Sequence, residues 1–254
     1  ENYERALLTL AGTSDPEGLA ATSTCLLNLG TLYRNVGLPE QAKDAYDRAF
    51  KIDQQLSNKD SMADDLTNIG NIMVDELDDP EQGLRILEQA REIRFAVARE
   101  NGGRFARNAA DTLDALGAAY QAAGRFDDAL ASYEQTAEID TQYGSPGGKV
   151  PTIINRGELF LVGMNNLDLA SVEFKNAIRE LEGRTDADPE DIWRAYDGLG
   201  RTELRAGDIR SAELHFLKAL DVTSRIKKNF GDKQMGRTFN ASHSLPAYSL
   251  ALLY

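Results

Sequence analysis

A glycine-centred pattern recurs along this chain at intervals of 40 to 47 residues. A large apolar residue precedes the glycine in four of the five copies, and a large residue follows three positions later in four. A repeat of this length is one supersecondary unit that cannot bury its apolar face alone, so successive repeats must stack on one another. The glycines are Gly30, Gly70, Gly117, Gly157 and Gly200.

A second pattern follows each glycine, with small and large residues alternating at spacings of three and four. This spacing places each set on one face of a helix. The small residues allow two helix backbones to approach, and the large residue fills the space between them. The sets are Ala42, Tyr46, Ala49; Gly83, Leu87, Ala90; Ala129, Tyr133, Thr136; Ala170, Phe174, Ala177; and Ala212, Phe216, Ala219.

Helix-breaking residues separate the two patterns in every copy. A Gly at the end of one helix and a Pro or Asp at the start of the next are typical of a tight helix–helix turn. The sequence therefore predicts an all-α fold of antiparallel helix pairs. The predicted turns are Gly37-Leu38-Pro39, Asp78-Asp79-Pro80, Gly124-Arg125, Asn165-Asn166 and Gly207-Asp208.

Together these patterns resemble the tetratricopeptide-repeat (TPR) family, with Leu29 to Ala49 and Leu116 to Tyr133 matching almost fully. The resemblance covers nearly the whole chain and implies a right-handed superhelical solenoid of about five full repeats. The repeats exceed the 34 residues of a basic TPR. They are similar to the longer-repeat branch, which includes kinesin light chains, LGN/Pins adaptors and bacterial TPR sensor arrays.

We predict a single solenoid over residues 1–254, with partial repeats at both ends. Asn2 to Leu7 superposes on Arg125 to Leu130, so the chain is expected to open inside a second helix. Pro246 to Tyr254 is similar to the first helix of a sixth repeat. Two partial repeats predict a segment of a longer protein. The predicted repeats are 16–57, 61–100, 104–143, 149–183 and 188–230, with partial repeats 1–13 and 244–254.

The net charge of −13 argues against a nucleic-acid or anionic-membrane surface, because phosphate groups would be repelled. No apolar run approaches the roughly 20 residues that span a bilayer, so we expect no membrane insertion. The single cysteine, Cys25, excludes an intramolecular disulfide and a thiol cluster for zinc. We therefore expect a cytoplasmic protein, with a periplasmic or secreted location as the alternative.

No set of residues predicts catalysis, a metal site or a cofactor. The segment from Gly144 to Lys149 has the wrong spacing for a phosphate loop, and Val150 stands where Ser or Thr would reach Mg²⁺. His215 and His243 have no neighbouring ligand set, and Cys25 has no His to activate it. We therefore predict that the chain is not an enzyme.

In TPR proteins the residues around the Leu-Gly pair face a concave groove lined by the first helices. The resemblance implies that a protein or peptide partner binds there. The groove residues expected here are Asn28, Thr31, Arg34 and Asn35; Asn68, Asn71 and Asp75; Asp114, Ala118 and Gln121; Asn155 and Glu158; and Arg194, Asp197, Arg201 and Arg205.

Three asparagines, Asn28, Asn68 and Asn155, share one register two positions before the glycine. An Asn side chain has one acceptor and two donors, so it can pair with both the C=O and the N–H of an extended peptide. A ladder of such residues predicts peptide binding largely independent of the peptide's sequence. The alternative is that these asparagines only cap or solvate an exposed helix face.

The last full repeat carries Arg194, Arg201 and Arg205 on or near one face, opposed by Asp197. Guanidinium groups pair bidentately with carboxylates, so this face is a candidate for receiving an acidic group. The alternative, equally weighted, is a solvated charged face.

Two charged residues interrupt the apolar pattern: Arg156 stands where Leu is expected, and Glu203 where an aromatic residue is expected. Because first helices of adjacent repeats touch, we predict a structural contact between Arg156 and Glu203. An unpaired charge at either position would be costly.

Two functions are consistent with these features. The favoured one is a protein–protein interaction scaffold that holds a peptide or partner domain in its groove. The alternative is a sensor or regulatory segment of a larger enzyme or transcription regulator, whose effector domain lies outside this chain. Self-association through the open repeat ends is a further expectation.

Overall fold

The computed structural model describes residues 12–101, 106–143 and 149–230, and every regular element within those ranges is helical. The chain divides into two compact units, an N-terminal unit of residues 1–125 and a C-terminal unit of residues 126–254. Within the described ranges, no helix combines the length and apolar character that crossing a bilayer requires.

The repeat limits given above stay a prediction. The partial repeats 1–13 and 244–254 lie outside the described residues, apart from positions 12 and 13, and so do His243 and residues 144–148.

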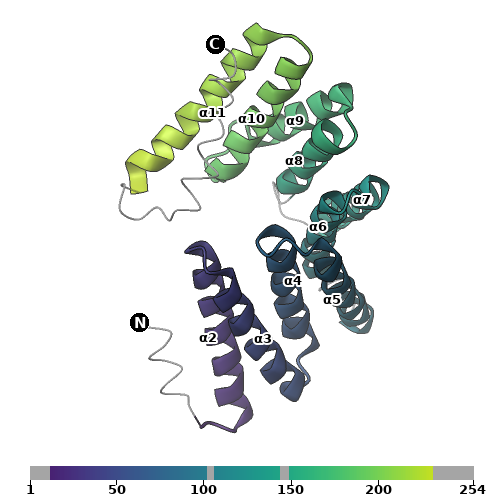
Figure 1. Cartoon of the computed structure of the whole chain (residues 1–254), viewed down its shortest axis with the longest axis vertical. Coiled ribbons are helices and arrows are strands. Elements are labelled where there is room, and N and C mark those ends of the chain that lie inside the picture. Colours follow the sequence, from purple (N-terminus) through teal and green to yellow (C-terminus); the bar gives the residue numbers. More distant parts are fainter. Residues whose placement is uncertain (1–11, 102–105, 144–148, 231–254) are drawn as a thin grey trace. The chain divides into compact units, whose positions relative to one another are not determined.

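The N-terminal unit consists of helices that pack on one another in chain order (Figure 1). The contacts join α2 to α3, α3 to α4, α4 to α5, and α5 to α6. The first helices of the predicted repeats are α2, α4 and α6, and the second helices are α3 and α5. The bounds are α2 (Pro16–Asn35), α3 (Pro39–Leu56), α4 (Lys59–Asp75), α5 (Pro80–Asn101) and α6 (Ala106–Ala122).

The C-terminal unit begins with a second helix, α7, and continues with two helix pairs (Figure 1). The first helix of the fourth repeat is interrupted, because α8 passes directly into the five-residue π-helical turn η2. The bounds are α7 (Phe126–Tyr143), α8 (Val150–Glu158), η2 (Leu159–Gly163), α9 (Leu167–Leu181), α10 (Pro189–Arg205) and α11 (Ile209–Phe230).

The predicted helix breaks are confirmed in all five copies. Gly37, Gly124 and Gly207 adopt positive φ angles of 75°, 73° and 85°, the left-handed conformation that ends a helix at little cost for glycine. In the other two turns, Asp78 and Asn165 adopt the same conformation. Asp and Asn tolerate it better than most residues, so the same turn is built by two kinds of residue.

In the helix pairs α2–α3, α4–α5, α8–α9 and α10–α11, a large side chain of the second helix packs on a glycine of the first. A Cβ added at Gly30 would lie 2.6 Å from the Tyr46 ring, and one at Gly200 would lie 2.6 Å from the Phe216 ring. Leu87 occupies the corresponding place against Gly70. The predicted packing of large on small residues is therefore confirmed in these pairs.

Phe174 of α9 is held between two glycines. Its ring contacts Gly157 of α8 and Gly198 of α10, and the side chain is fully buried. The ring thus joins its own helix pair to the next one, and both neighbouring backbones must lack a Cβ at the point of contact.

Gly198→Ala tests this packing. Helix propensity alone would favour alanine by about 1 kcal/mol. However, the new Cβ would lie 2.3 Å from the Phe174 ring, which is fully buried and already packs against Gly157. We expect a net destabilisation of about 1–3 kcal/mol, measured by urea unfolding.

The control is Ala131→Gly at an exposed position of α7, which measures the propensity contribution without a clash. If Gly198→Ala raises the stability instead, the Phe174 ring is not confined as described.

Candidate functional site

The first helices of the N-terminal unit are joined by polar contacts along their length. Arg34 of α2 donates to Asp75 and Glu76 at the end of α4, at 2.8 and 2.7 Å. The hydroxyls of Thr67 on α4 and Thr112 on α6 lie 3.1 Å apart. These contacts join α2 to α4 and α4 to α6, the helices that carry the predicted groove face.

Amide side chains on this face have no hydrogen-bonding partner within the described part of the chain. They are Asn28 on α2 and both Asn68 and Asn71 on α4. Asn28 is exposed, and the other two are half-buried. Gln121 on α6 is half-buried and likewise without a described partner. The face therefore offers several donors and acceptors that the fold does not use.

Other residues predicted to line this face have partners within the protein. Arg34 and Asp75 bind each other. Thr31 donates to the carbonyl of Leu27 at 3.1 Å and lies 3.0 Å from the Tyr46 hydroxyl, so it helps to seat the core tyrosine. Asn35 and Asp114 also make interactions within the chain.

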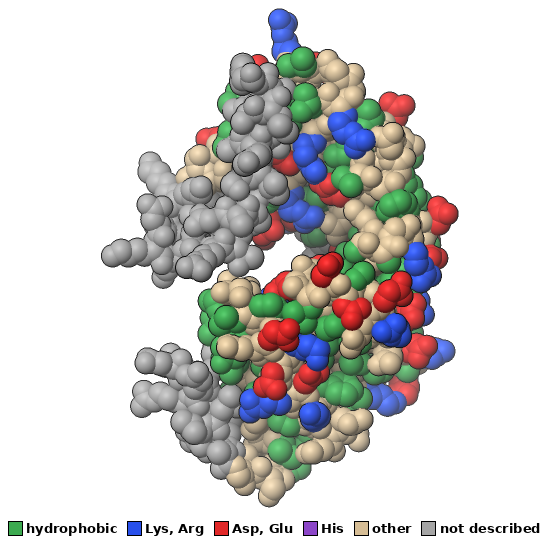
Figure 2. Space-filling model, in the orientation of Figure 1, with side chains coloured by type: hydrophobic (Ala, Val, Ile, Leu, Met, Phe, Trp, Pro, Cys, Tyr) green, Lys and Arg blue, Asp and Glu red, His purple; other side chains and the backbone are tan. Residues whose placement is uncertain are grey.

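Figure 2 shows acidic and basic side chains interspersed on the visible surface, as expected when most charges are paired.

In the C-terminal unit, the arginines predicted for the groove connect α10 to the first helix of the preceding repeat. Arg194 donates to the Asn155 side chain at 2.7 Å. Arg205 donates to the Leu161 carbonyl and to the Asn165 side chain, both at 2.5 Å. These two guanidinium groups therefore hold α10 against α8, η2 and the turn that follows.

Arg201 forms the centre of this set of contacts. It pairs with Glu158 of α8 and lies 2.9 Å from Asp197, one turn earlier on its own helix. Asp197 is only 3% exposed. A buried carboxylate needs a nearby cation, so Arg201 neutralises a charge that the fold has already buried.

The three asparagines of the predicted ladder thus differ in whether another side chain of the protein binds them. Asn28 and Asn68 have no described partner, whereas the Oδ1 atom of Asn155 accepts from Arg194. A peptide that paired with Asn155 through this oxygen would have to displace the arginine. The N-terminal unit therefore carries the more accessible part of the predicted face.

The predicted contact between Arg156 and Glu203 is wrong. Arg156 donates to Glu173 of α9 at 2.5 Å, and Glu203 lies 2.7 Å from Nδ1 of His215 on α11. Each charged residue therefore pairs with the second helix of its own repeat. The core positions that they occupy point toward that helix and not toward the neighbouring first helix. Burial raises the pKa of Glu173, and Arg156 partly offsets this shift.

Sequence reasoning missed a buried cation in the N-terminal unit. Arg94 of α5 is 2% exposed and pairs with Asp60 and Asp64, one turn apart on α4. Asn108 of α6 donates to both oxygens of Asp60 at 3.3 Å. The sequence feature that could have indicated this burial is a spacing: Arg94 stands seven residues after Leu87, so both side chains lie on the buried face of α5.

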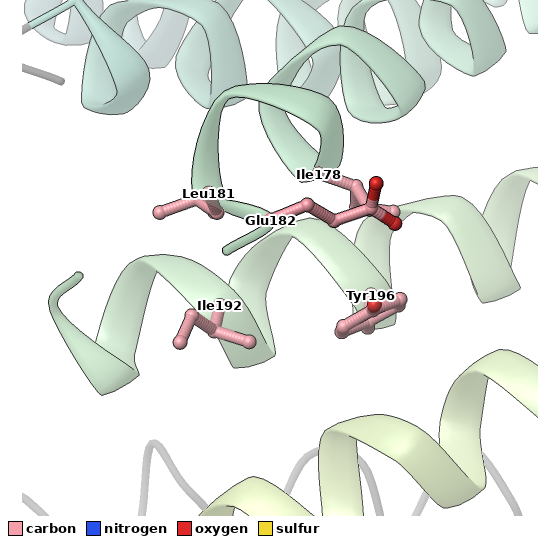
Figure 3. Close-up of a pocket in the computed structure, with 5 residues that line it drawn as sticks. All are labelled: Ile178, Leu181, Glu182, Ile192 and Tyr196. Atoms are coloured by element: carbon pink, nitrogen blue, oxygen red, sulfur yellow. The ribbon is translucent and has the colours of Figure 1, made fainter. Parts of the chain in front are cut away.

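A small pocket lies between the end of α9 and the start of α10 (Figure 3). Ile178, Leu181 and Ile192 make it mainly apolar, and Glu182 and Tyr196 complete the lining. No residue predicted for the groove lines it. Among the described residues, no group of three or more His, Cys, Asp or Glu side chains is arranged to hold a metal ion.

Arg201→Ala distinguishes a structural arginine from one that is free to receive a ligand. We expect a loss of about 1–2 kcal/mol in the free energy of unfolding, because Asp197 stays buried without its guanidinium partner. The measurement is urea unfolding followed by the fluorescence of Trp193, which is buried on the same helix. Lys175→Ala, at an exposed position of α9, is the control. If the two variants are equally stable, Arg201 does not have this structural role.

Solved structures similar to this chain are helical-repeat proteins. BtubC (BKLC) from P. vanneervenii has a TM-score of 0.72 at 19% identity, covering 89% of this chain and 90% of its own. A putative kinesin light chain from Podosopora anserina, described by its nearly identical TPR-like repeats, has a TM-score of 0.61 at 13% identity, covering 85% and 100%. Pseudomonas aeruginosa pilF has a TM-score of 0.56 at 17% identity, covering 93% and 96%.

At these identities the likeness concerns the fold, and it confirms the predicted all-α, TPR-like solenoid. No curated protein sequence matches the chain. The model of the soluble NSF attachment protein family, SNAP, matches residues 13–145, just over half of the 254-residue chain. The chain therefore belongs to the SNAP family and is a protein of the tetratricopeptide-repeat type.

Proposed function

We propose that this chain is a protein-interaction scaffold that binds an extended peptide segment of a partner along α2 and α4. The TPR-like fold is typical of protein–protein interaction scaffolds. The observation that carries the proposal is the set of amides of Asn28, Asn68 and Asn71, which have no described partner although the charges around them are paired.

The chemistry of these amides suits a peptide backbone. Each provides one acceptor and two donors, matching the alternating C=O and N–H groups of an extended chain. Recognition of this kind depends little on the side chains of the peptide. A partner would then be selected by what flanks the amides, which here includes the ion pair of Arg34 with Asp75 and Glu76.

The same ion pair favours binding in a second way. It ties the end of α2 to the end of α4, so the amides on the two helices keep their spacing before a peptide arrives. Less ordering on binding means that more of the interaction energy appears as affinity.

We assign a different role to the predicted groove residues of the C-terminal unit. Arg194, Arg201 and Arg205 would act first as ties between α10 and its neighbour, because each has partners inside the protein. A partner on this face would bind beside these contacts or exchange with them.

The family is named for soluble attachment proteins of NSF, and a protein partner for this chain agrees with that description. The proposed activity is binding without catalysis, on a chain whose net charge of −13 disfavours nucleic acid.

The triple variant Asn28→Ala/Asn68→Ala/Asn71→Ala tests the proposal. Peptides are first selected from a random-sequence phage library, and their affinities are measured by fluorescence anisotropy. Each lost hydrogen bond is worth about 0.5–1.5 kcal/mol, so the triple variant should bind at least about tenfold more weakly. The control is Gln54→Ala/Gln55→Ala, which removes two exposed amides from the second helix α3.

The peptide supplies an independent check of backbone recognition. Replacing its side chains one at a time by alanine should change the affinity little, whereas N-methylation of the bound backbone should weaken it. Undiminished binding by the triple variant, together with tolerance of N-methylation, would overturn the proposal.

A further inference from the structure

Three buried polar side chains from three helices meet in the N-terminal unit. Ser23 of α2, Asp53 of α3 and Asp65 of α4 are 4%, 2% and 0% exposed. The Ser23 hydroxyl donates to the Asp53 carboxyl. The Asp53 carboxyl is in turn within hydrogen-bonding reach of Asp65. This cluster lies where the first helix pair, α2 and α3, packs on the first helix of the second pair.

Asp65 has no conventional hydrogen-bond donor. Among the described residues, no N–H or O–H group reaches either of its oxygens, although both are buried. The group in reach is another carboxyl, that of Asp53, and two carboxyls can share a hydrogen bond only if one carries a proton. Burial, together with the charges of Asp53 and Asp64, raises the pKa of Asp65 to about 8.

The surrounding charges leave Asp65 without a counterion. The cation of this region, Arg94 of α5, is bound by Asp60 and Asp64 on the side of α4 that faces α5. Asp111 of α6 adds a further negative charge near Asp64. From α3, the groups close to Asp65 are Asp53 and the phenol of Tyr46, whose pKa is raised chiefly by burial.

We propose that Asp53 and Asp65 form a proton-held latch between α3 and α4, which opens when the shared proton is lost. With the proton present, Asp65 donates to Asp53 and the two helices are joined by a buried hydrogen bond. Without it, two carboxylates face each other away from water. The repulsion between these carboxylates falls only if α3 and α4 separate enough for water to reach both of them.

The repeat itself shows that a carboxyl is not needed for packing at this position. Asp65 stands five residues before Gly70, and the same position in the next three copies holds Thr112, Thr152 and Ala195. All three are buried. The acid is therefore an exception within the chain's own pattern, and it sits opposite a second buried acid.

The direction of the pH effect follows from the pKa of Asp65. The ordinary pKa of this carboxyl, which applies to the unfolded chain, is 3.8, and burial beside Asp53 and Asp64 raises it to about 8 in the folded chain. Below about pH 4 both states hold the proton, and the latch contributes its full stability. As the pH rises toward 8, only the folded state retains the proton, so stability falls, and it levels off above that pH.

The test compares the wild-type protein with Asp65→Asn and Asp65→Thr. An Asn amide has an N–H donor for Asp53 that does not depend on pH, and Thr is the residue found at this position in two other repeats. Between pH 6 and pH 9 the wild-type Tm should fall by roughly 5–10 °C more than that of either variant. Glu40→Gln, at an exposed acid on α3, should follow the wild type. Parallel Tm curves for the wild type and both variants would overturn the latch.

Two further measurements locate the effect. Hydrogen exchange by mass spectrometry, with Asp65→Asn at the same pH as reference, should show faster exchange in α3 and α4 of the wild type at pH 9. Carboxyl ¹³C NMR of the wild-type protein should give a midpoint for Asp65 above pH 7, and a midpoint below pH 5 would overturn the proposal without any variant.

Because α4 carries Asn68 and Asn71, opening of the latch should also weaken the peptide binding proposed above at high pH. This consequence rests on the proposed function, whereas the melting, exchange and NMR results do not. A protein that shows the pH-dependent opening but binds no peptide would retain the latch and lose the proposed function.

Discussion

The contact between a large side chain of the second helix and a glycine of the first underlies the rest of this structure. It brings the two backbones together within a pair, as Tyr46 does on Gly30 and Phe216 on Gly200. Phe174 extends the same contact to two neighbouring first helices, through Gly157 and Gly198. Because the apolar interior is filled in this way, polar side chains of the first helices remain near the surface, where they can tie adjacent repeats together or stay available.

Those polar side chains divide into two groups with different consequences. In the C-terminal unit, the arginines of α10 reach back to the first helix of the preceding repeat or to the turn after it. Arg194, Arg201 and Arg205 therefore all have partners within the protein. In the N-terminal unit, Arg34 ties α2 to Asp75 and Glu76 at the end of α4, while the amides of Asn28, Asn68 and Asn71 have no described partner. Polar side chains of the first helices thus tie adjacent repeats together in the C-terminal unit, whereas several of them make no described hydrogen bond in the N-terminal unit.

Buried charge is a second theme of the N-terminal unit. Arg94 is compensated by two carboxylates of α4, whereas Asp65 faces another acid. A buried ion pair with both signs is tolerated over a wide pH range, but a pair of acids depends on a proton. Two solutions to the burial of charge therefore meet on α4: an opposite charge compensates one, and a retained proton the other.

The sequence by itself determined the helix pairs, their turns and the residues at the core of each pair. These depend on neighbours within one or two helices, and the spacings of three and four residues report such neighbours directly. The tertiary structure decided which polar side chains meet. Arg156 pairs with Glu173 of its own repeat and not with Glu203, and Asp65 of α4 meets Asp53 of α3. Partners of this kind depend on the distance and rotation between packed helices, which a one-dimensional pattern does not encode.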